Sequence, residues 1–277
     1  MSATAGRRSP TSTLARVVER RWCAIAGHSK WANIKHRKQA QDKKRGKLFA
    51  KLIRAIESAA READTSDPEL SPSLAMAVQN AKDNDVPKDT IERACKRGAG
   101  ELAGAATYEP AQYEGYAPNG VAVLVDCLTD NRNRTASDVR KAFTDVGGSL
   151  AEPGAVAFMF NRRGRVVVEA DGASEDDIML TGLDHGLEDI DHDEDVFTAW
   201  CDPTDVTQLR KILEEDGGFS IRESGTTMVP TSTVPIHDAG DAKKVLALMD
   251  ALDDNDDVQD VYANFDIDDQ IIEQVES

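Results

Sequence analysis

The strongest chemical signal in the sequence is a dense run of positive charge between residues 28 and 54. Ten Lys and Arg side chains stand there against one acid, Asp42. A phosphate backbone requires cations at this density, because each phosphate that is neutralised releases bound counterions. A solvated helix face is the alternative, but such a face seldom runs ten to one in sign. We therefore predict nucleic-acid binding through Lys30, Lys35, Arg37, Lys38, Lys43, Lys44, Arg45, Lys47, Lys51 and Arg54.

Two flat side chains lie within this run. Trp31 and His36 can stack on an unpaired base, which is a common mode of RNA and single-strand recognition. For Trp31 a core or packing position is favoured over stacking, since large aromatic side chains are mostly buried. Both residues belong to the predicted nucleic-acid-binding set.

A second candidate contact is the segment 129–135, Thr-Asp-Asn-Arg-Asn-Arg-Thr. It joins an apolar run to a predicted helix start, where backbone N–H groups together with Arg132 and Arg134 can receive a phosphate. The alternative, of equal weight, is a capping loop in which Asn and Asp side chains hold the turn. Tyr113 and Tyr116, in the preceding loop, form either an aromatic rim or a cover for a sheet edge.

The sequence contains no constellation of catalytic or cofactor-binding residues. The glycines of residues 98–104 have the wrong spacing for a dinucleotide-binding loop and follow a predicted helix instead of a strand. The acidic runs 184–195 and 253–257 fail the glycine requirement of a calcium-binding loop, and the first is interpreted as solvated surface. We predict a protein that is not an enzyme and uses no cofactor.

The cysteines and the other histidines carry no metal or redox signal. The four cysteines lie far apart and form no CxxC pair, which indicates packed thiols in a reducing compartment. His28, His36 and His237 have no nearby cysteine or paired acids, so metal ligation by them is not expected.

Charge is divided unevenly along the chain. The net charge of −17 is the sum of +12 over residues 1–63 and −29 over residues 64–277. One end of the chain therefore attracts polyanions and the rest repels them. The longest apolar run, residues 120–125, is far shorter than the roughly 20 residues that cross a bilayer, so no membrane partner is expected.

Residues 1–26 are predicted to be a basic leader outside the fold. They contain five arginines and one acid, and they lack the apolar core of a secretory signal. Two interpretations stay open: a mitochondrial transit peptide, which implies the mitochondrial matrix, and a start codon assigned too far upstream. The chain after this leader has a net charge of −21. That acidity is more usual in a bacterial or salt-adapted cytoplasmic protein, so a cytoplasmic location is favoured.

The segment after the leader is predicted to form a bundle of short helices. Apolar side chains recur every three or four residues from Leu48 to Ala60. The pair Ser71-Pro72 is a start signal for a second helix, and Pro87 for a third. We assign residues 27–105 to this basic helical domain.

Beyond residue 105 the apolar pattern changes to strands that alternate with helices. The predicted strands cover residues 120–127, 155–160, 165–169, 187–191, 196–200, 219–223, 227–236 and 258–264. The predicted helices cover residues 135–146, 174–185, 205–215 and 239–252. A Thr135/Asp138 capping box is expected to start the first of these helices. The elements make two βαββαβ units, and a turn at residues 161–164 is where one is inserted in the other.

The predicted fold class is therefore α+β. An N-terminal three-helix domain is followed by two ferredoxin-like βαββαβ domains, one inserted in the other. The split domain covers residues 106–162 and 226–277, and the acidic inserted domain covers residues 163–225.

Several motifs are specific enough to carry a family resemblance. They include Ala26-Gly-His-Ser-Lys-Trp-Ala-Asn-Ile-Lys-His-Arg-Lys, Tyr113-Glu-Gly-Tyr-Ala-Pro-Asn-Gly-Val-Ala, Leu128-Thr-Asp-Asn-Arg-Asn-Arg-Thr and Asp257-Val-Gln-Asp-Val-Tyr-Ala-Asn-Phe. Over residues 26–267 the chain closely resembles the YebC/PmpR family. That family usually begins just before Ala26, where this chain has Ile25 in place of a starting Met.

The resemblance implies a non-enzymatic protein of three domains that regulates gene expression. Members of the family are described as DNA-binding transcriptional regulators and as ribosome-associated translation factors that relieve stalls at proline-rich sequences. Mitochondrial relatives resemble a translational activator of a cytochrome oxidase subunit. The expected partner is thus nucleic acid, either DNA or ribosomal RNA, and the ribosome is the partner under the translation alternative.

Overall fold

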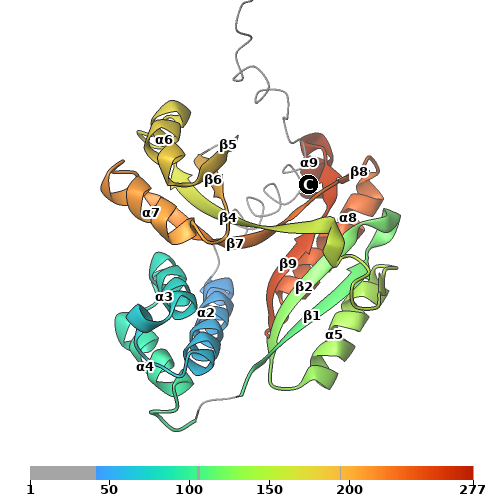
Figure 1. Cartoon of the computed structure of the whole chain (residues 1–277). Coiled ribbons are helices and arrows are strands. Elements are labelled where there is room, and N and C mark those ends of the chain that lie inside the picture. The colour runs from blue at the N-terminus through green and yellow to red at the C-terminus, as the bar shows by residue number, and fades with distance from the viewer. Residues whose placement is uncertain (1–41, 105–106, 194, 277) are drawn as a thin grey trace, which may run out of the picture.

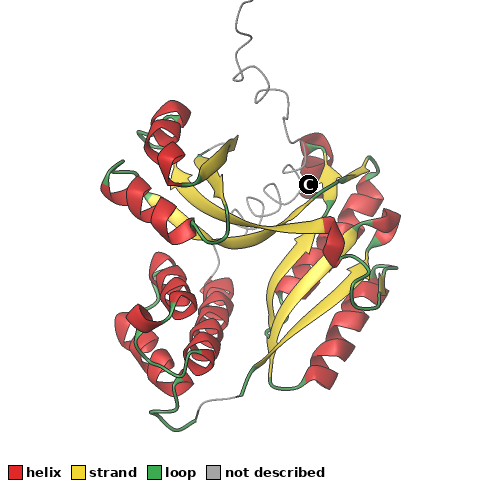
Figure 2. Cartoon of the chain, viewed as in Figure 1, coloured by secondary structure: helices red, strands yellow, loops and turns green. Residues whose placement is uncertain are grey.

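The computed structural model describes residues 42–104, 107–193 and 195–276, and it has three parts (Figure 1). The basic helical domain lies below the inserted domain in this view, and the split domain lies beside both. The predicted leader and the first part of the basic run, up to residue 41, fall outside the described residues. The predicted α+β class is confirmed: a helical N-terminal part precedes two four-stranded antiparallel sheets (Figure 2).

The described part of the basic helical domain contains three α-helices, as its sequence predicts. They are α2 (Asp42–Glu62), α3 (Pro72–Asp83) and α4 (Lys88–Gly98). Ser71 caps α3 through its hydroxyl, which accepts a hydrogen bond from the backbone N–H of Leu74. Ile56, Leu74 and Ile91 bring one apolar face of each helix into a shared core. This core fixes the orientation of α2, on which most of the described residues of the predicted binding set lie.

Close packing of α4 on α2 leads to a stability prediction. A Cβ atom added at Gly98 would lie 2.5 Å from the carbonyl oxygen of Glu57, a backbone contact that cannot relax cheaply. We expect Gly98→Ala to lower the free energy of unfolding by about 2 kcal/mol in chemical denaturation. Gly46→Ala is the control, since nothing lies within 4 Å of its added Cβ atom. There the smaller backbone entropy of the unfolded chain should stabilise α2 by about 0.5–1 kcal/mol. Equal effects at the two positions would contradict the prediction.

The inserted domain has the strand order of a ferredoxin-like fold. Its strands are β4 (Phe160–Glu169), β5 (Leu187–Asp193), β6 (Val196–Cys201) and β7 (Ile221–Pro230), in the sheet order β5-β6-β4-β7. Helices α6 (Glu175–Gly182) and α7 (Val206–Glu215), with a short 3-10 turn η5 (Leu183–His185), complete the βαββαβ unit. This agrees with the predicted unit, including both of its helices.

The split domain does not have the predicted βαββαβ order, because its sheet includes a first strand, β1 (Glu109–Tyr116), at residues that were predicted to be a loop. The sheet runs β3-β1-β2-β9, formed by β1, β2 (Ala122–Thr129), β3 (Ser149–Leu150) and β9 (Val258–Ala263). Strand β1 lies between β3 and β2 in the sheet, although it comes first in the chain. Strand β1 contains a proline and a glycine, which both disfavour strands. It therefore forms because it pairs antiparallel with β2 along its whole length.

Three further expectations for this region are wrong. Residues 155–160 are not a strand: η4 (Ala157–Met159) is a 3-10 turn, and the backbone N–H groups at its start bond to Glu114 instead of a neighbouring strand. Residues 161–164 are not a turn, because β4 runs straight through them. The separate strands expected at 219–223 and 227–236 are largely one strand, β7, paired with β4 from Phe160 to Val168. The two long strands thus carry the chain between the domains.

Helices α5 (Arg132–Asp145) and α8 (Ala239–Asp253) cover one face of the split-domain sheet. Their core with β2 and β9 is apolar, and Phe143, Leu248 and Met249 are among its buried side chains. The C-terminal segment adds the strands β8 (Val234–Ile236) and β10 (Phe265–Ile267) and the helix α9 (Asp269–Glu276). Of these, β10 and α9 have no counterpart in the predicted elements. None of the helices in the described part of the chain is long and apolar enough to span a membrane.

Candidate nucleic-acid interface

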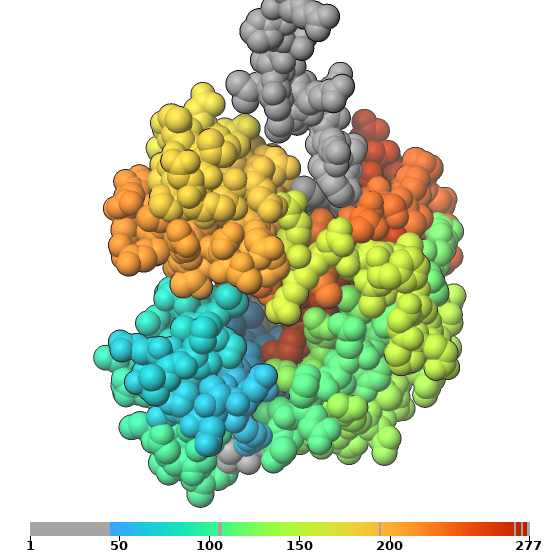
Figure 3. Space-filling model, viewed as in Figure 1, coloured from blue at the N-terminus to red at the C-terminus, as the bar shows by residue number. Residues whose placement is uncertain are grey.

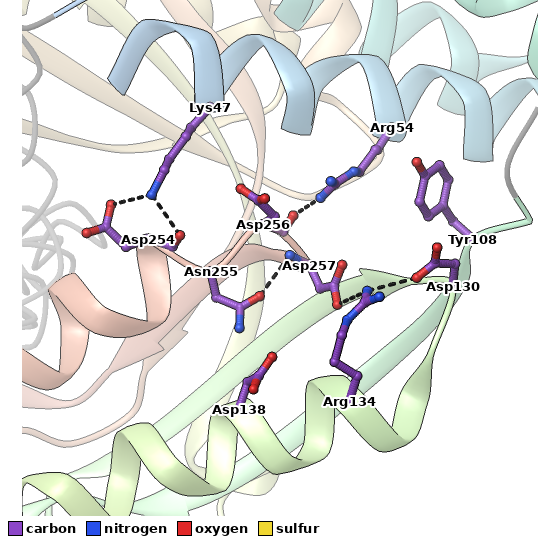
Figure 4. Close-up of a pocket in the computed structure, with 10 residues that line it drawn as sticks. All are labelled: Lys47, Arg54, Tyr108, Asp130, Arg134, Asp138, Asp254, Asn255, Asp256 and Asp257. Atoms are coloured by element: carbon purple, nitrogen blue, oxygen red, sulfur yellow. Dashed lines mark hydrogen bonds and ion pairs between the residues drawn. The ribbon is translucent and has the colours of Figure 1, made fainter. Parts of the chain in front are cut away.

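Three of the predicted binding residues form one stripe along α2. Lys47, Lys51 and Arg54 are four and three residues apart, a spacing that places them on the same face of a helix. This face is turned toward the loop between α8 and β9 (Figure 4). We call these three residues the α2 cation stripe.

The α2 cation stripe binds an acidic turn of the split domain. The Lys47 ammonium donates to the carboxylate of Asp254 at 3.1 Å, and the Lys51 ammonium donates to that of Asp253 at 3.0 Å. Arg54 donates to the backbone carbonyl of Asp256. The residues 253–257, which we call the acidic turn, therefore face the cations over the length of the stripe.

Backbone carbonyls at the end of α8 add to this attraction. The Lys51 ammonium lies 2.7 Å from the carbonyl oxygen of Asp253, and the Lys47 ammonium lies 3.0 Å from that of Asp254. The last carbonyls of a helix have no partner within it and carry the negative end of its dipole. The two lysines therefore cap α8 from another domain. Lys51 is the more enclosed of the two, with 12% of its side chain exposed against 45% for Lys47.

A pocket of about 440 Å³ opens beside these contacts, between the basic helical domain and the split domain. The space-filling view shows a hollow in the surface between the same two domains (Figure 3). The pocket is lined by Lys47, Arg54, Tyr108, Asp130, Arg134, Asp138, Asp254, Asn255, Asp256 and Asp257. Across it, the Arg54 guanidinium lies 5.6 Å from the centre of the Tyr108 ring, which is within cation–π range.

Asp257 is the buried polar centre on the split-domain side of this pocket. Its carboxylate accepts hydrogen bonds from Thr135 at 2.8 Å, Thr129 at 3.3 Å and the Arg134 guanidinium at 2.6 Å. Burial opposes ionisation of Asp257, but the bonds from Arg134 and the threonines outweigh it and hold its pKa below the usual value. Arg134 also bonds Asp130 at 2.8 Å. Its pKa is raised by the same carboxylates.

The two arginines of the segment 129–135 point to different places. Arg134 faces the pocket, whereas Arg132 donates to the Glu109 carboxylate at 3.1 Å and to the Pro110 carbonyl at 2.9 Å. The Tyr113 hydroxyl donates to the backbone carbonyl of Arg132 at 3.2 Å. A tyrosine therefore does lie beside this helix start, but it comes from strand β1.

The predicted Thr135/Asp138 capping box is wrong. Helix α5 begins at Arg132, and the Asn131 side chain caps it by accepting a hydrogen bond from the Arg134 N–H at 3.1 Å. Thr135 is fully buried, and its hydroxyl donates a hydrogen bond to the Asp257 carboxylate instead of capping the helix. The Asn131 cap agrees with the capping-loop alternative for this segment.

The other predicted binding residues are only partly placed. Lys43 and Lys44 belong to the first turn of α2. Arg45 pairs with Asp85 at 3.4 Å, and its guanidinium lies 5.5 Å from the centre of the Phe49 ring. The remaining predicted residues lie outside the described residues: Lys30, Trp31, Lys35, His36, Arg37 and Lys38.

The partners of the α2 cation stripe are not among the residues predicted from the sequence. The acidic turn was considered only as a calcium loop, and Tyr108 was not singled out. The sequence shows that α2 is basic and that the acidic turn, about 200 residues later, has the opposite charge. Charge alone does not predict which acidic segment contacts which basic segment. Within the described ranges, no group of three His, Cys, Asp or Glu side chains is placed to hold a metal ion.

The described cysteines are buried free thiols, which agrees with the predicted packing role. They are Cys95, Cys127 and Cys201. Burial raises the pKa of Cys127 and of Cys201 to about 12, so both are protonated at neutral pH.

The fold and this interface define a class of α+β protein in which a cationic helical domain is joined to two domains with four-stranded antiparallel sheets, one inserted in the other. Comparison with known proteins places the chain within that class. Residues 29–101 match the family domain described as the TACO1/YebC protein N-terminal domain, and residues 108–265 match the TACO1/YebC second and third domain. The chain belongs to the TACO1/YebC family.

The similar proteins are full-length matches. A protein of Thermobifida fusca is 52% identical to this chain, and the match covers 91% of this chain and 100% of that protein. A protein of Halothermothrix orenii is 50% identical, and the match covers 91% of this chain and 99% of that protein. Each is named a probable transcriptional regulatory protein. The crystal structure of a conserved hypothetical protein from Aquifex aeolicus matches with a TM-score of 0.75 at 44% identity. That match covers 82% of this chain and 93% of the other.

Proposed function

We propose that this protein is a non-enzymatic, nucleic-acid-binding regulator of gene expression, and that the basic helical domain carries the binding. The observation that supports this most directly is the density of cations on the first half of α2, where five Lys and Arg residues fall within Lys43–Lys51. The names of the relatives, probable transcriptional regulatory proteins, favour DNA as the target. A cytoplasmic location accords with the bacterial sources of these relatives.

Electrostatic binding makes a prediction about salt. Replacing Lys43, Lys44, Arg45 and Lys47 by Ala should weaken binding to duplex DNA and to RNA alike. The slope of log affinity against log salt concentration should flatten by roughly one unit for each phosphate that the variant no longer neutralises. Fluorescence anisotropy of a labelled duplex and a labelled RNA hairpin over a salt series measures both effects.

The control for this experiment is Arg93→Ala/Lys96→Ala, which removes two exposed cations from α4 of the same domain. This variant should bind almost as the wild type does. A salt slope that is unchanged in the α2 variant, or equally changed in the control, would reject α2 as the binding element.

A ribosome-associated translation factor is the second candidate function. The observation that favours it is the divergence of Arg132 from Arg134, because Arg132 lies on a part of the split domain away from the pocket and is 61% exposed. An exposed arginine apart from the α2 cations offers a second point of contact, which suits a large folded RNA better than a short duplex. Arg132→Ala/Arg134→Ala should then abolish ribosome co-sedimentation while duplex binding by the basic helical domain remains. The reverse result would reject the translation role and leave the transcriptional one.

A further inference from the structure

The α2 cation stripe is already occupied by anionic groups of the same chain. Over two turns of α2, each of its three cations meets a carboxylate or a carbonyl oxygen of the acidic turn. A phosphate backbone would present the same kind of acceptor, a row of negative oxygens, to the same donors. A nucleic acid that bound α2 would therefore compete with the acidic turn for one surface.

This contact is built differently from the other contact of the basic helical domain. On the inserted domain, Met76 of α3 packs against the apolar core, and Arg210 donates two part-buried hydrogen bonds of 2.6 and 2.9 Å to Asp83. No described side chain of the basic helical domain joins the apolar core of the split domain. The described contact with the split domain is thus polar, whereas the contact with the inserted domain combines apolar packing with an enclosed ion pair.

Polar contacts of this kind can be exchanged. In the Lys47–Asp254 pair, 45% of the lysine side chain and 62% of the aspartate side chain are exposed. Exposed ion pairs are weak and are screened by salt. Two glycines, Gly100 and Gly104, lie just before the chain enters the split domain, and glycine can adopt more backbone conformations than any other residue. The basic helical domain can then leave the acidic turn while it stays docked on the inserted domain.

We propose that the acidic turn, residues 253–257, is an autoinhibitory contact that covers the α2 cation stripe, and that nucleic acid binds α2 only by displacing it. This inference rests on the proposed nucleic-acid binding by α2. It gives the acidic turn a role that a solvated surface or a metal loop would not have.

The test is to neutralise the acidic turn while keeping its shape. Asp253→Asn/Asp254→Asn/Asp256→Asn retains the backbone carbonyls and removes three charges. We expect the variant to bind a labelled 20-base-pair duplex and an RNA hairpin about tenfold more tightly at fixed salt, a typical size for a coupling between two sites. Glu175→Gln/Asp176→Asn/Asp184→Asn is the matched control, since it removes three exposed charges from the inserted domain. It corrects for the change in net charge and should show a much smaller gain.

Hydrogen exchange on the wild-type protein provides a readout that needs no folded variant. Saturating duplex should speed the exchange of backbone amides in residues 254–258, because a turn released from α2 opens the local hydrogen bonds of these amides more often. Tighter binding by the Asn variant together with faster exchange supports autoinhibition. A variant that binds no more tightly than the control, or a turn whose exchange is unchanged or slower, overturns it.

If the proposed nucleic-acid binding itself is wrong, the results differ from those that reject autoinhibition. In that case neither the wild type nor the Asn variant would bind either nucleic acid, and replacing Lys43, Lys44, Arg45 and Lys47 by Ala would change nothing. If the wild type binds and the α2 variant does not, while the Asn variant gains nothing over the control, then only the autoinhibition is rejected.

Discussion

Replacing Asp83 by Ala is expected to destabilise the docking of the basic helical domain on the inserted domain by about 3–5 kcal/mol. Asp83 accepts two hydrogen bonds from Arg210, which also donates to Ser224 at 2.8 Å. The two charged side chains are only 7% and 11% exposed. Removal of the carboxylate therefore leaves the enclosed guanidinium with the longer contact to Glu214, at 3.5 Å, as its remaining counter-charge. Urea denaturation, together with hydrogen exchange in α3, measures the loss.

A double replacement separates the cost of an unpaired charge from the contribution of the pair. Asp83→Leu/Arg210→Met fills a similar volume with apolar groups, and buried ion pairs replaced in this way are often neutral or stabilising. We expect this variant to lie within about 1 kcal/mol of the wild type, in keeping with the small cost of volume-conserving apolar swaps. If the single and the double variants lose the same stability, the loss comes from packing and the explanation from buried charge is wrong.

Replacing Glu114 by Ala should cost about 3 kcal/mol of the free energy of unfolding, because several backbone donors lose one charged acceptor. The carboxylate accepts from the N–H groups of Gly154, Val156 and Ala157 at 2.5, 2.6 and 2.8 Å. Glu114 is 6% exposed, so water replaces these bonds poorly. Thermal and urea denaturation measure the effect, and Glu109→Gln, at an exposed position of the same strand, is the control.

The same carboxylate predicts a pH dependence. Burial opposes ionisation of Glu114, but the three N–H bonds outweigh it and lower its pKa from the usual 4.5. A group with a lowered pKa in the folded state stabilises the protein fully above its unfolded pKa. This stability is lost as pH falls through the lower value in the folded state. The difference in stability between wild type and Glu114→Gln should therefore be constant near neutrality and shrink below about pH 4.5. A constant difference down to pH 3 would contradict this role.

Local signals in the sequence were sufficient for the elements that depend on local rules. The Ser71-Pro72 start of α3 and the apolar face of α2 were predicted because capping and helical periodicity act over a few residues. The βαββαβ order of the inserted domain was predicted for a similar reason, since each of its elements has its own apolar pattern and its neighbours follow directly in the chain.

The errors fall where a distant segment determines the local structure. Strand β1 has a weak pattern of its own and forms because β2 pairs with it. Residues 155–160 are as apolar as a strand, yet Glu114 takes their backbone N–H groups and holds them in a turn. Thr135 matches a capping box, but Asp257 draws its hydroxyl into the interior. In each case a long-range hydrogen bond outweighs the local preference.

The fold class, the family resemblance and the concentration of cations before residue 55 can be predicted from the sequence, because these depend on composition, periodicity and motifs. What those cations contact depends on how distant parts of the chain pack together. Lys51 and Asp253 are separated by 202 residues, and nothing in either segment specifies the other. They meet because the apolar core of the split domain sets the end of α8 opposite α2, and at that short range the opposite charges attract each other.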